Sequence, residues 1–114
     1  MENIDLTYLN EISGGDNSFI KEMLDLFINT TALEVNEFDH LLAEGNYEAI
    51  SQLAHKMKAP IQMIGASVLF ERLRKIENDG KNRTNLESIP NLINEVKVKI
   101  GDLSNDIHAL LATM

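Results

Sequence analysis

Apolar residues recur at intervals of three and four along almost the whole chain, and this spacing constrains the fold more than any other feature. The longest such series lies near the C-terminus and comprises Leu86, Ile89, Ile93, Val96, Ile100, Leu103, Ile107 and Leu110. This spacing places the side chains on one face of an α-helix and is typical of the seam of a helical bundle. No stretch has the alternation of a half-buried strand, so we expect an all-α fold.

Residues that end helices divide this pattern into five segments. Gly14-Gly15 follows the first segment, Gly45 the second and Gly65-Ala66 the third, and glycine commonly follows a helix. The expected helices span 5–13, 16–44, 47–64, 67–80 and, after a polar loop at 81–85, the residues up to about 111. Short connections make neighbouring helices antiparallel. We therefore expect an antiparallel four-helix bundle with a short extra helix at its N-terminal end.

Several polar residues are suited to begin these helices. Three of them can cap a helix N-terminus: Asp5, Asn46 and Ser67. Thr84-x-x-Glu87 matches a capping box before the last helix. Pro60 falls inside the third helix, where proline removes one backbone hydrogen bond and clashes with the preceding turn. We expect a bend at Pro60 or an early switch to a looser turn.

The composition limits what kind of protein this is. The 114 residues suit one domain with one core. The net charge of −8 makes nucleic acid an unexpected partner, because such binding needs a basic face. No run approaches the roughly 20 apolar residues of a membrane span, and the acidic N-terminus is not a signal peptide. With no cysteine, the chain fits a reducing compartment. We expect a single cytoplasmic, monomeric domain over residues 1–114.

The third helix, at about 47–64, carries a histidine that should stand in solvent. Its apolar face consists of Ile50, Leu53, Ala54, Met57, Ile61, Ile64 and Val68. At about 100° per residue, His55 points away from the centre of that face. Ala59 lies one turn further on, directly above His55, while Gln62 shares its flank and Lys58 lies toward the edge of the apolar stripe. An imidazole beside a small side chain and a cation suits a bulky anionic partner.

The segment around His55 resembles the signature of histidine-containing phosphotransfer (HPt) domains, approximately Ala-His-x-Leu-Lys-Gly with Gly-Ala further on. The matching residues are Ala54, His55, Lys58, Gly65 and Ala66, with Met57 in place of Leu. The length and the helix layout of the chain also agree with the family. The sequence departs from the signature at Ala59, where the family has glycine, and at Pro60, which is unusual there.

The resemblance implies that the chain is an intermediate of a two-component phosphorelay. His55 Nε2 would accept a phosphoryl group from the phosphoaspartate of a receiver domain, and a second receiver would later take it. The imidazole suits this step, since its unperturbed pKa of about 6.5 leaves a free ring nitrogen at cytoplasmic pH. Lys58 matches the family lysine that stabilises the phosphoryl charge. Lys56 would add a weaker attraction, Ala59 would leave room for the partner, and Gln62 would hydrogen-bond the phosphoryl group or the partner.

The resemblance also implies the partners. They are response-regulator receiver domains, with a hybrid sensor histidine kinase as a further candidate, and they would dock around His55 on the first three helices. The receiver would supply Mg²⁺, so the chain needs no cofactor of its own. It has no Gly-rich phosphate loop and is therefore not expected to be an ATP-using kinase.

Three other functions compete with this interpretation. A non-catalytic adaptor would bind a receiver through the same bundle without being phosphorylated, and Ala59 and Pro60 leave room for it. A dimeric histidine-kinase hairpin would need an adjoining ATP-binding domain, for which the chain has no length. A metal-binding bundle would need two facing Glu-x-x-His motifs. Only Glu37-x-x-His40 has that spacing, because Gln52 and Asn105 precede the other two histidines, so no metal site is expected.

Overall fold

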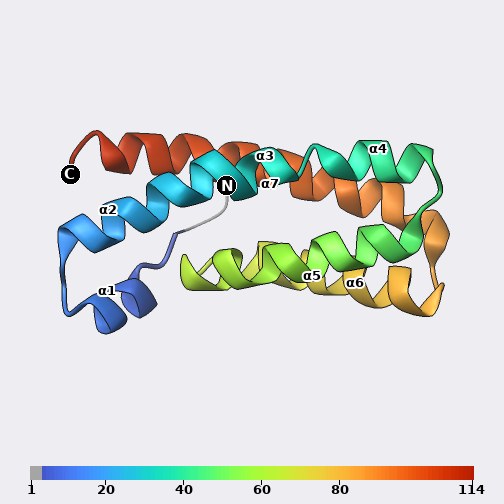
Figure 1. Cartoon of the computed structure of the whole chain (residues 1–114), viewed down its shortest axis with the longest axis horizontal. Coiled ribbons are helices and arrows are strands. Elements are labelled where there is room, and N and C mark those ends of the chain that lie inside the picture. Colours follow the sequence, from blue (N-terminus) through green and yellow to red (C-terminus); the bar gives the residue numbers. More distant parts are fainter. Residues whose placement is uncertain (1–3) are drawn as a thin grey trace.

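The chain forms four antiparallel rods of helix with a short helix across one end, in a computed structural model that describes residues 4–114 (Figure 1). The elements are α1 (Thr7–Ser13), α2 (Asn17–Leu26), the π-helical turn η1 (Phe27–Thr31), α3 (Ala32–Glu34), α4 (Glu37–Ala43), α5 (Tyr47–Met63), α6 (Ser67–Asn82), the 3₁₀ turn η2 (Leu86–Ser88) and α7 (Ile89–Leu111). The segments α2 to α4 together make the first rod. Residues 4–114 contain no strand, and the predicted all-α bundle with an extra N-terminal helix is confirmed.

The rods pack around one core, and each contacts its two neighbours. The first rod contacts α5 and α7, and α6 lies against both α5 and α7. The predicted apolar faces supply the core, since Ile50, Ala54, Met57 and Ile61 of α5 are all fully buried. None of the described helices is long and apolar enough to cross a membrane.

A polar cap holds the beginning of α5, as predicted for Asn46. Asn46 accepts a hydrogen bond from the backbone N–H of Ala49 at 3.1 Å, which orients the start of α5. Asp5 precedes the N-cap position of α1, which Leu6 occupies, and its side chain accepts a hydrogen bond from the backbone N–H of Thr7 at 3.0 Å. The predicted cap at Ser67 is wrong, because Ala66 occupies the N-cap position of α6 and makes no side-chain cap.

The second predicted helix is interrupted. It begins as predicted, but the π-helical turn η1 replaces regular helix at residues 27–31, and a turn at Val35–Asn36 separates α3 from α4. The Thr30 hydroxyl donates to the carbonyl of Leu26 at 2.6 Å, and such side-chain bonds compete with the regular backbone ladder. A π-turn inserts an extra residue into a helix and often occurs at functional sites.

The fourth helix is longer than predicted, because Gly80 does not end it. The helix α6 continues to Asn82, and Gly80 is buried inside it against α5. A Cβ at Gly80 would lie 3.0 Å from the carbonyl oxygen of Tyr47, so this glycine permits a close approach of two helices. Thr84 belongs to the end of α6 rather than to a capping box, since its hydroxyl donates to Asp79 at 3.2 Å.

The sharp turn between α5 and α6 receives the N-terminal segment. Gly65 has a φ of +72°, and a Cβ there would lie 2.5 Å from the backbone oxygen of Asp5. The backbone N–H of Asp5 donates to the carbonyl of Ile64 at 2.9 Å. Pro60 does not cause an early switch to a looser turn, because α5 remains α-helical up to Met63. The alternative, a bend, stays a prediction.

Candidate functional site

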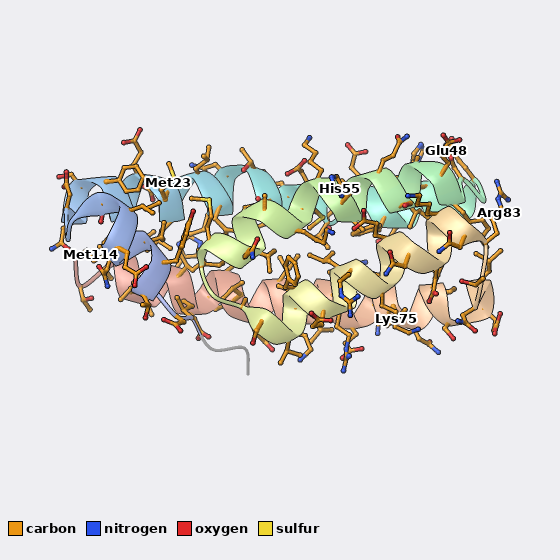
Figure 2. All side chains as sticks on the ribbon, turned by 90° about the horizontal axis from the view of Figure 1, so that it is seen from below. Met23, Glu48, His55, Lys75, Arg83 and Met114 are labelled. Atoms are coloured by element: carbon orange, nitrogen blue, oxygen red, sulfur yellow. The ribbon has the colours of Figure 1, made fainter. Side chains whose placement is uncertain are left out.

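The predicted nucleophile, His55, lies near the middle of α5 and stands in solvent. Figure 2 shows it between Met23, toward one end of the bundle, and Glu48 and Arg83 at the other. The buried face of α5 fixes the orientation of the helix, and 70% of the His55 side chain is exposed. The exposure predicted from helical periodicity is therefore confirmed.

Glu77 of α6 binds His55, and sequence reasoning missed this residue. Nδ1 of His55 lies 2.7 Å from Oε2 of Glu77, and only 17% of the Glu77 side chain is exposed. The two helices are fixed here, because the Ser51 hydroxyl donates to the backbone carbonyl of Glu77 at 2.8 Å. A usable signal was present in the sequence, since His55 and Glu77 are almost equally distant from the turn at Gly65-Ala66 and therefore face each other in the hairpin.

Lys58 completes a cluster with these two residues. Its ammonium lies 2.5 Å from Oε1 of Glu77 and is 5.7 Å from the centre of the Phe70 ring. The Lys58 side chain is 20% exposed, in agreement with its predicted place at the edge of the apolar stripe. The ammonium and the carboxylate thus form a close ion pair.

The cluster decides the charge of Glu77. Burial by itself would raise the pKa of Glu77, but the Lys58 ammonium and the contact with His55 together hold it below its ordinary value. Glu77 is therefore a carboxylate at neutral pH. A carboxylate can only accept hydrogen bonds, so Nδ1 of His55 carries a proton and donates a hydrogen bond to Oε2. In the neutral ring Nε2 then has a free lone pair and faces away from Glu77.

The three predicted supporting residues lie in different surroundings. Ala59 and Gln62 are exposed on α5, beyond His55. Lys56 points to the other side of the helix, where its ammonium lies 2.7 Å from Glu34 of α3. The hydrogen bond and charge of Glu34 raise the pKa of Lys56 above its ordinary value. The structure thus brings Lys58, but not Lys56, into the cluster with His55.

Two hollows flank α5. One, here called the polar hollow, has a volume of about 480 Å³ and is bordered by Glu48, Gln52, His55, Glu77, Lys81 and Arg83. The other, here called the apolar groove, is about 740 Å³ and is bordered by Leu9, Met23, Leu33, Lys56, Pro60 and Met63. The groove lies between α5 and the irregular first rod, with α1 at one end. His55 and Lys56, adjacent in sequence, therefore border different surfaces.

The Glu37-x-x-His40 motif, the other candidate for chemistry, lies on α4. His40 lies 3.6 Å from Glu44, one turn further along, and both are well exposed. Within residues 4–114, no three His, Cys, Asp or Glu residues are grouped so that they could hold a metal ion.

Comparisons with known proteins give one family and one solved structure. The family model described as the Hpt domain matches residues 22–113. The crystal structure of histidine-containing phosphotransfer protein B (HptB) from Pseudomonas aeruginosa PAO1 is similar, with a TM-score of 0.87 at 18% sequence identity. The match covers 97% of this chain and 96% of that one; at this identity it concerns the fold alone. Comparison with curated proteins gave no match.

Proposed function

Because this chain belongs to the Hpt domain family, we propose that His55 accepts a phosphoryl group from the phosphoaspartate of a receiver domain and passes it to the aspartate of another. Members of this family act in phosphorelays with receiver domains. One observation carries the assignment to His55: its ring is 70% exposed, while Nδ1 is engaged by Glu77. Nε2 is thereby the nitrogen that can react, and we place the reaction in the cytoplasm.

The chemical step needs positioning more than proton transfer. The lone pair of Nε2 attacks the phosphorus, and the bond from phosphorus to the aspartyl oxygen breaks, so the aspartate leaves as a carboxylate with the electron pair. The proton on Nδ1 stays in its bond to Glu77 throughout. The ring therefore gains positive charge while the phosphoryl group keeps its negative charge. Return of the group to a second aspartate reverses the same movements.

The resemblance to the family implies that Lys58 stabilises the negative charge of the phosphoryl group. Its ammonium is 2.5 Å from Glu77, so direct contact with a phosphoryl group on Nε2 requires it to leave that carboxylate. Its positive charge acts near the site in either position. Gln62 and the small Ala59, both exposed on α5, remain candidates for contact with the phosphoryl group or the partner.

The apolar groove is the proposed docking surface for the receiver. It borders α5 on the side of Lys56, the residue that follows His55 in the sequence, and its apolar wall includes Leu26 and Leu33, both more than half exposed. Polar residues at its edge, such as Glu37, would limit the lifetime of the complex, as suits a transient encounter. The receiver would bring the phosphoaspartate and Mg²⁺, and the chain would act as a monomer.

Transfer of label from a phosphorylated receiver domain tests this function. The wild-type protein should gain a label that is stable to alkali and labile to acid, and His55→Gln should gain none. His40→Gln is the matched control, since His40 is also an exposed histidine beside a carboxylate, and it should be labelled like the wild type. If folded wild-type protein binds receivers but takes no label from any of them, the chain is a non-catalytic adaptor.

A further inference from the structure

We propose that Glu37 selects the partner: the receiver that docks in the apolar groove carries a lysine or arginine beside the apolar side chains that enter the groove, and this cation pairs with Glu37. This inference rests on the proposed function, which places the receiver at the groove. It deepens that function by naming the chemistry of the receiver's docking surface and a specificity residue on the first rod.

The charges on the border of the groove are not balanced. Among the described residues, the charged ones that border it are Glu34, Glu37 and Lys56. The ammonium of Lys56 lies 2.7 Å from the Glu34 carboxylate, so this ion pair joins the α5 wall of the groove to the α3 wall. The exposed Glu37 carboxylate makes no ion pair with any of residues 4–114. One negative charge on the border therefore has no partner of its own.

The first rod surrounds Glu37 with further negative charge. Residues 16–44 carry seven acidic side chains and one lysine, and they account for most of the net charge of −8. A surface with such a surplus attracts partners of the opposite charge and repels those of the same charge. The effect is already visible on Lys56, because Glu34 and, less strongly, Glu37 raise the pKa of its ammonium. A basic partner residue is therefore favoured at this border, and an acidic one is disfavoured.

Apolar contact and charge have separate tasks at this surface. Leu26 and Leu33 are 52% and 62% exposed along the groove, and covering them with apolar side chains of the partner would supply most of the affinity. Glu37 lies at the solvent-exposed edge, where a charge pair mainly raises the association rate and rejects unsuitable partners. Glu37 can thus distinguish between receivers whose apolar side chains fit the groove equally well.

Lys56 restricts where the incoming cation can bind. It occupies the Glu34 carboxylate and leaves Glu37 as the available carboxylate on the border. The Lys56 ammonium, which is well exposed, also repels a cation that approaches the α5 wall. The basic residue of the receiver is therefore directed to the first rod, at the start of α4.

The first experiment measures the association and dissociation rates of a receiver domain that binds the wild-type full chain, by stopped-flow fluorescence at low and high salt. Glu37→Lys should lower the association rate about tenfold at low salt and much less at high salt, with little change in dissociation. Glu22→Lys is the matched control, because it makes the same change of charge at an exposed position of the same rod outside the groove. It should slow association less than about twofold. Equal losses in the two variants would overturn the proposal.

A second variant tests the part played by Lys56. Lys56→Gln leaves Glu34 without its ammonium, so the border becomes more negative and the same receiver should associate faster, by about twofold to threefold at low salt. Slower association of Lys56→Gln would overturn the role given to Lys56.

The receiver itself identifies the partner of Glu37. Each lysine and arginine on its docking face is changed to glutamate in turn. One of these receivers should associate poorly with the wild type and recover with Glu37→Lys, since the exchanged charges again attract each other. Recovery in no such pair would overturn the proposal.

Failure of this proposal and failure of the proposed function give different results. At saturating receiver, Glu37→Lys should take up label at the wild-type rate, because the change affects only docking. Wild-type protein that takes no label from any receiver would refute the function of His55, while the binding rates would still report on Glu37. A labelled wild type, with Glu37→Lys associating like the wild type, would refute the role of Glu37 alone.

Discussion

The two sides of α5 are built differently. On the α6 side, the helices approach closely over Gly80, and the Ser51 hydroxyl and the His55–Glu77–Lys58 cluster bridge them. On the other side, α5 faces the first rod, in which the π-turn η1 and the three-residue helix α3 separate α2 from α4, and the apolar groove remains open between them. The difference indicates a division of labour. The regular hairpin fixes the ring of His55, and the irregular rod leaves an apolar surface open.

Truncating the buried residue that holds α1 on the bundle should have the largest effect on stability. It should alter the structure only on the groove side of α5. Leu9 is fully buried and is the one buried residue of α1. Leu9→Ala should lower the free energy of unfolding by about 2–5 kcal/mol, through lost burial and the cavity left behind. Urea unfolding measures this, with the half-exposed Ile12→Ala as the control that should cost little. An unaltered ¹⁵N spectrum of His55 in folded Leu9→Ala would support the separation of the two sides.

A larger residue at Gly80 should break the hairpin side instead. A Cβ there already meets the Tyr47 carbonyl at 3.0 Å, so Gly80→Leu should destabilise the protein by about 1–3 kcal/mol through overpacking. It should also push Glu77 away from His55 and slow phosphotransfer. Gly101→Leu is the matched control, because Gly101 is also helical and a Cβ there meets nothing within 4 Å. Equal stabilities of the two variants would contradict the close approach described here.

A charge in the groove should weaken docking without affecting the chemistry. Leu33 is 62% exposed on the groove side, so Leu33→Asp should change stability by less than about 0.5 kcal/mol. Its affinity for the receiver should fall about tenfold, roughly 1.4 kcal/mol, whereas the transfer rate at saturating receiver should stay the same. Val98→Asp, at an exposed apolar residue of α7 outside the groove, serves as the control. If both variants bind the receiver like the wild type, the docking surface lies elsewhere.

The smallest effect should be the contribution of Glu77 to the pH dependence of the unfolding free energy. The pKa of Glu77 is lowered in the folded protein by Lys58 and His55, against the opposing effect of burial. A lowered pKa means that the folded state favours the carboxylate, so its contribution is complete above the ordinary pKa of glutamate, about 4.5, and is lost as the pH falls through the lower folded value. The difference in unfolding free energy between wild type and Glu77→Gln should shrink over that acidic range. A constant difference would mean that Glu77 has an ordinary pKa.

Sequence reasoning predicted the exposed position of His55 and the helical bundle correctly, because both depend on local patterns. The spacing of Ile50, Ala54 and Met57 was enough to orient α5 and to place His55 outside. The π-turn escaped it, since Phe27, Thr31, Val35 and Phe38 keep a spacing of three and four that a continuous helix would share. Their burial follows this spacing even though the backbone between them is irregular.

Gly80 and Glu77 were missed for a different reason. The role of each depends on its contact with α5. When α6 is considered alone, a glycine predicts the end of a helix and a glutamate predicts a solvated charge. Glu77 follows Leu73 by four residues and precedes Gly80 by three, so all three share the side of α6 that faces α5. Aligning the two predicted helices as an antiparallel hairpin around Gly65-Ala66 would have placed Glu77 opposite His55.

The contact between Gly65 and Asp5 bears on where the working unit begins. The Hpt match starts at residue 22, yet the carbonyl of Ile64, at the end of the helix that carries His55, is hydrogen-bonded by the backbone of Asp5. A shortened chain that starts at the edge of the family match would keep every signature residue. It would nevertheless lose the segment that is hydrogen-bonded to the α5–α6 turn, and it would lose Leu9, which borders the apolar groove. A truncated variant of this protein should therefore begin before Asp5.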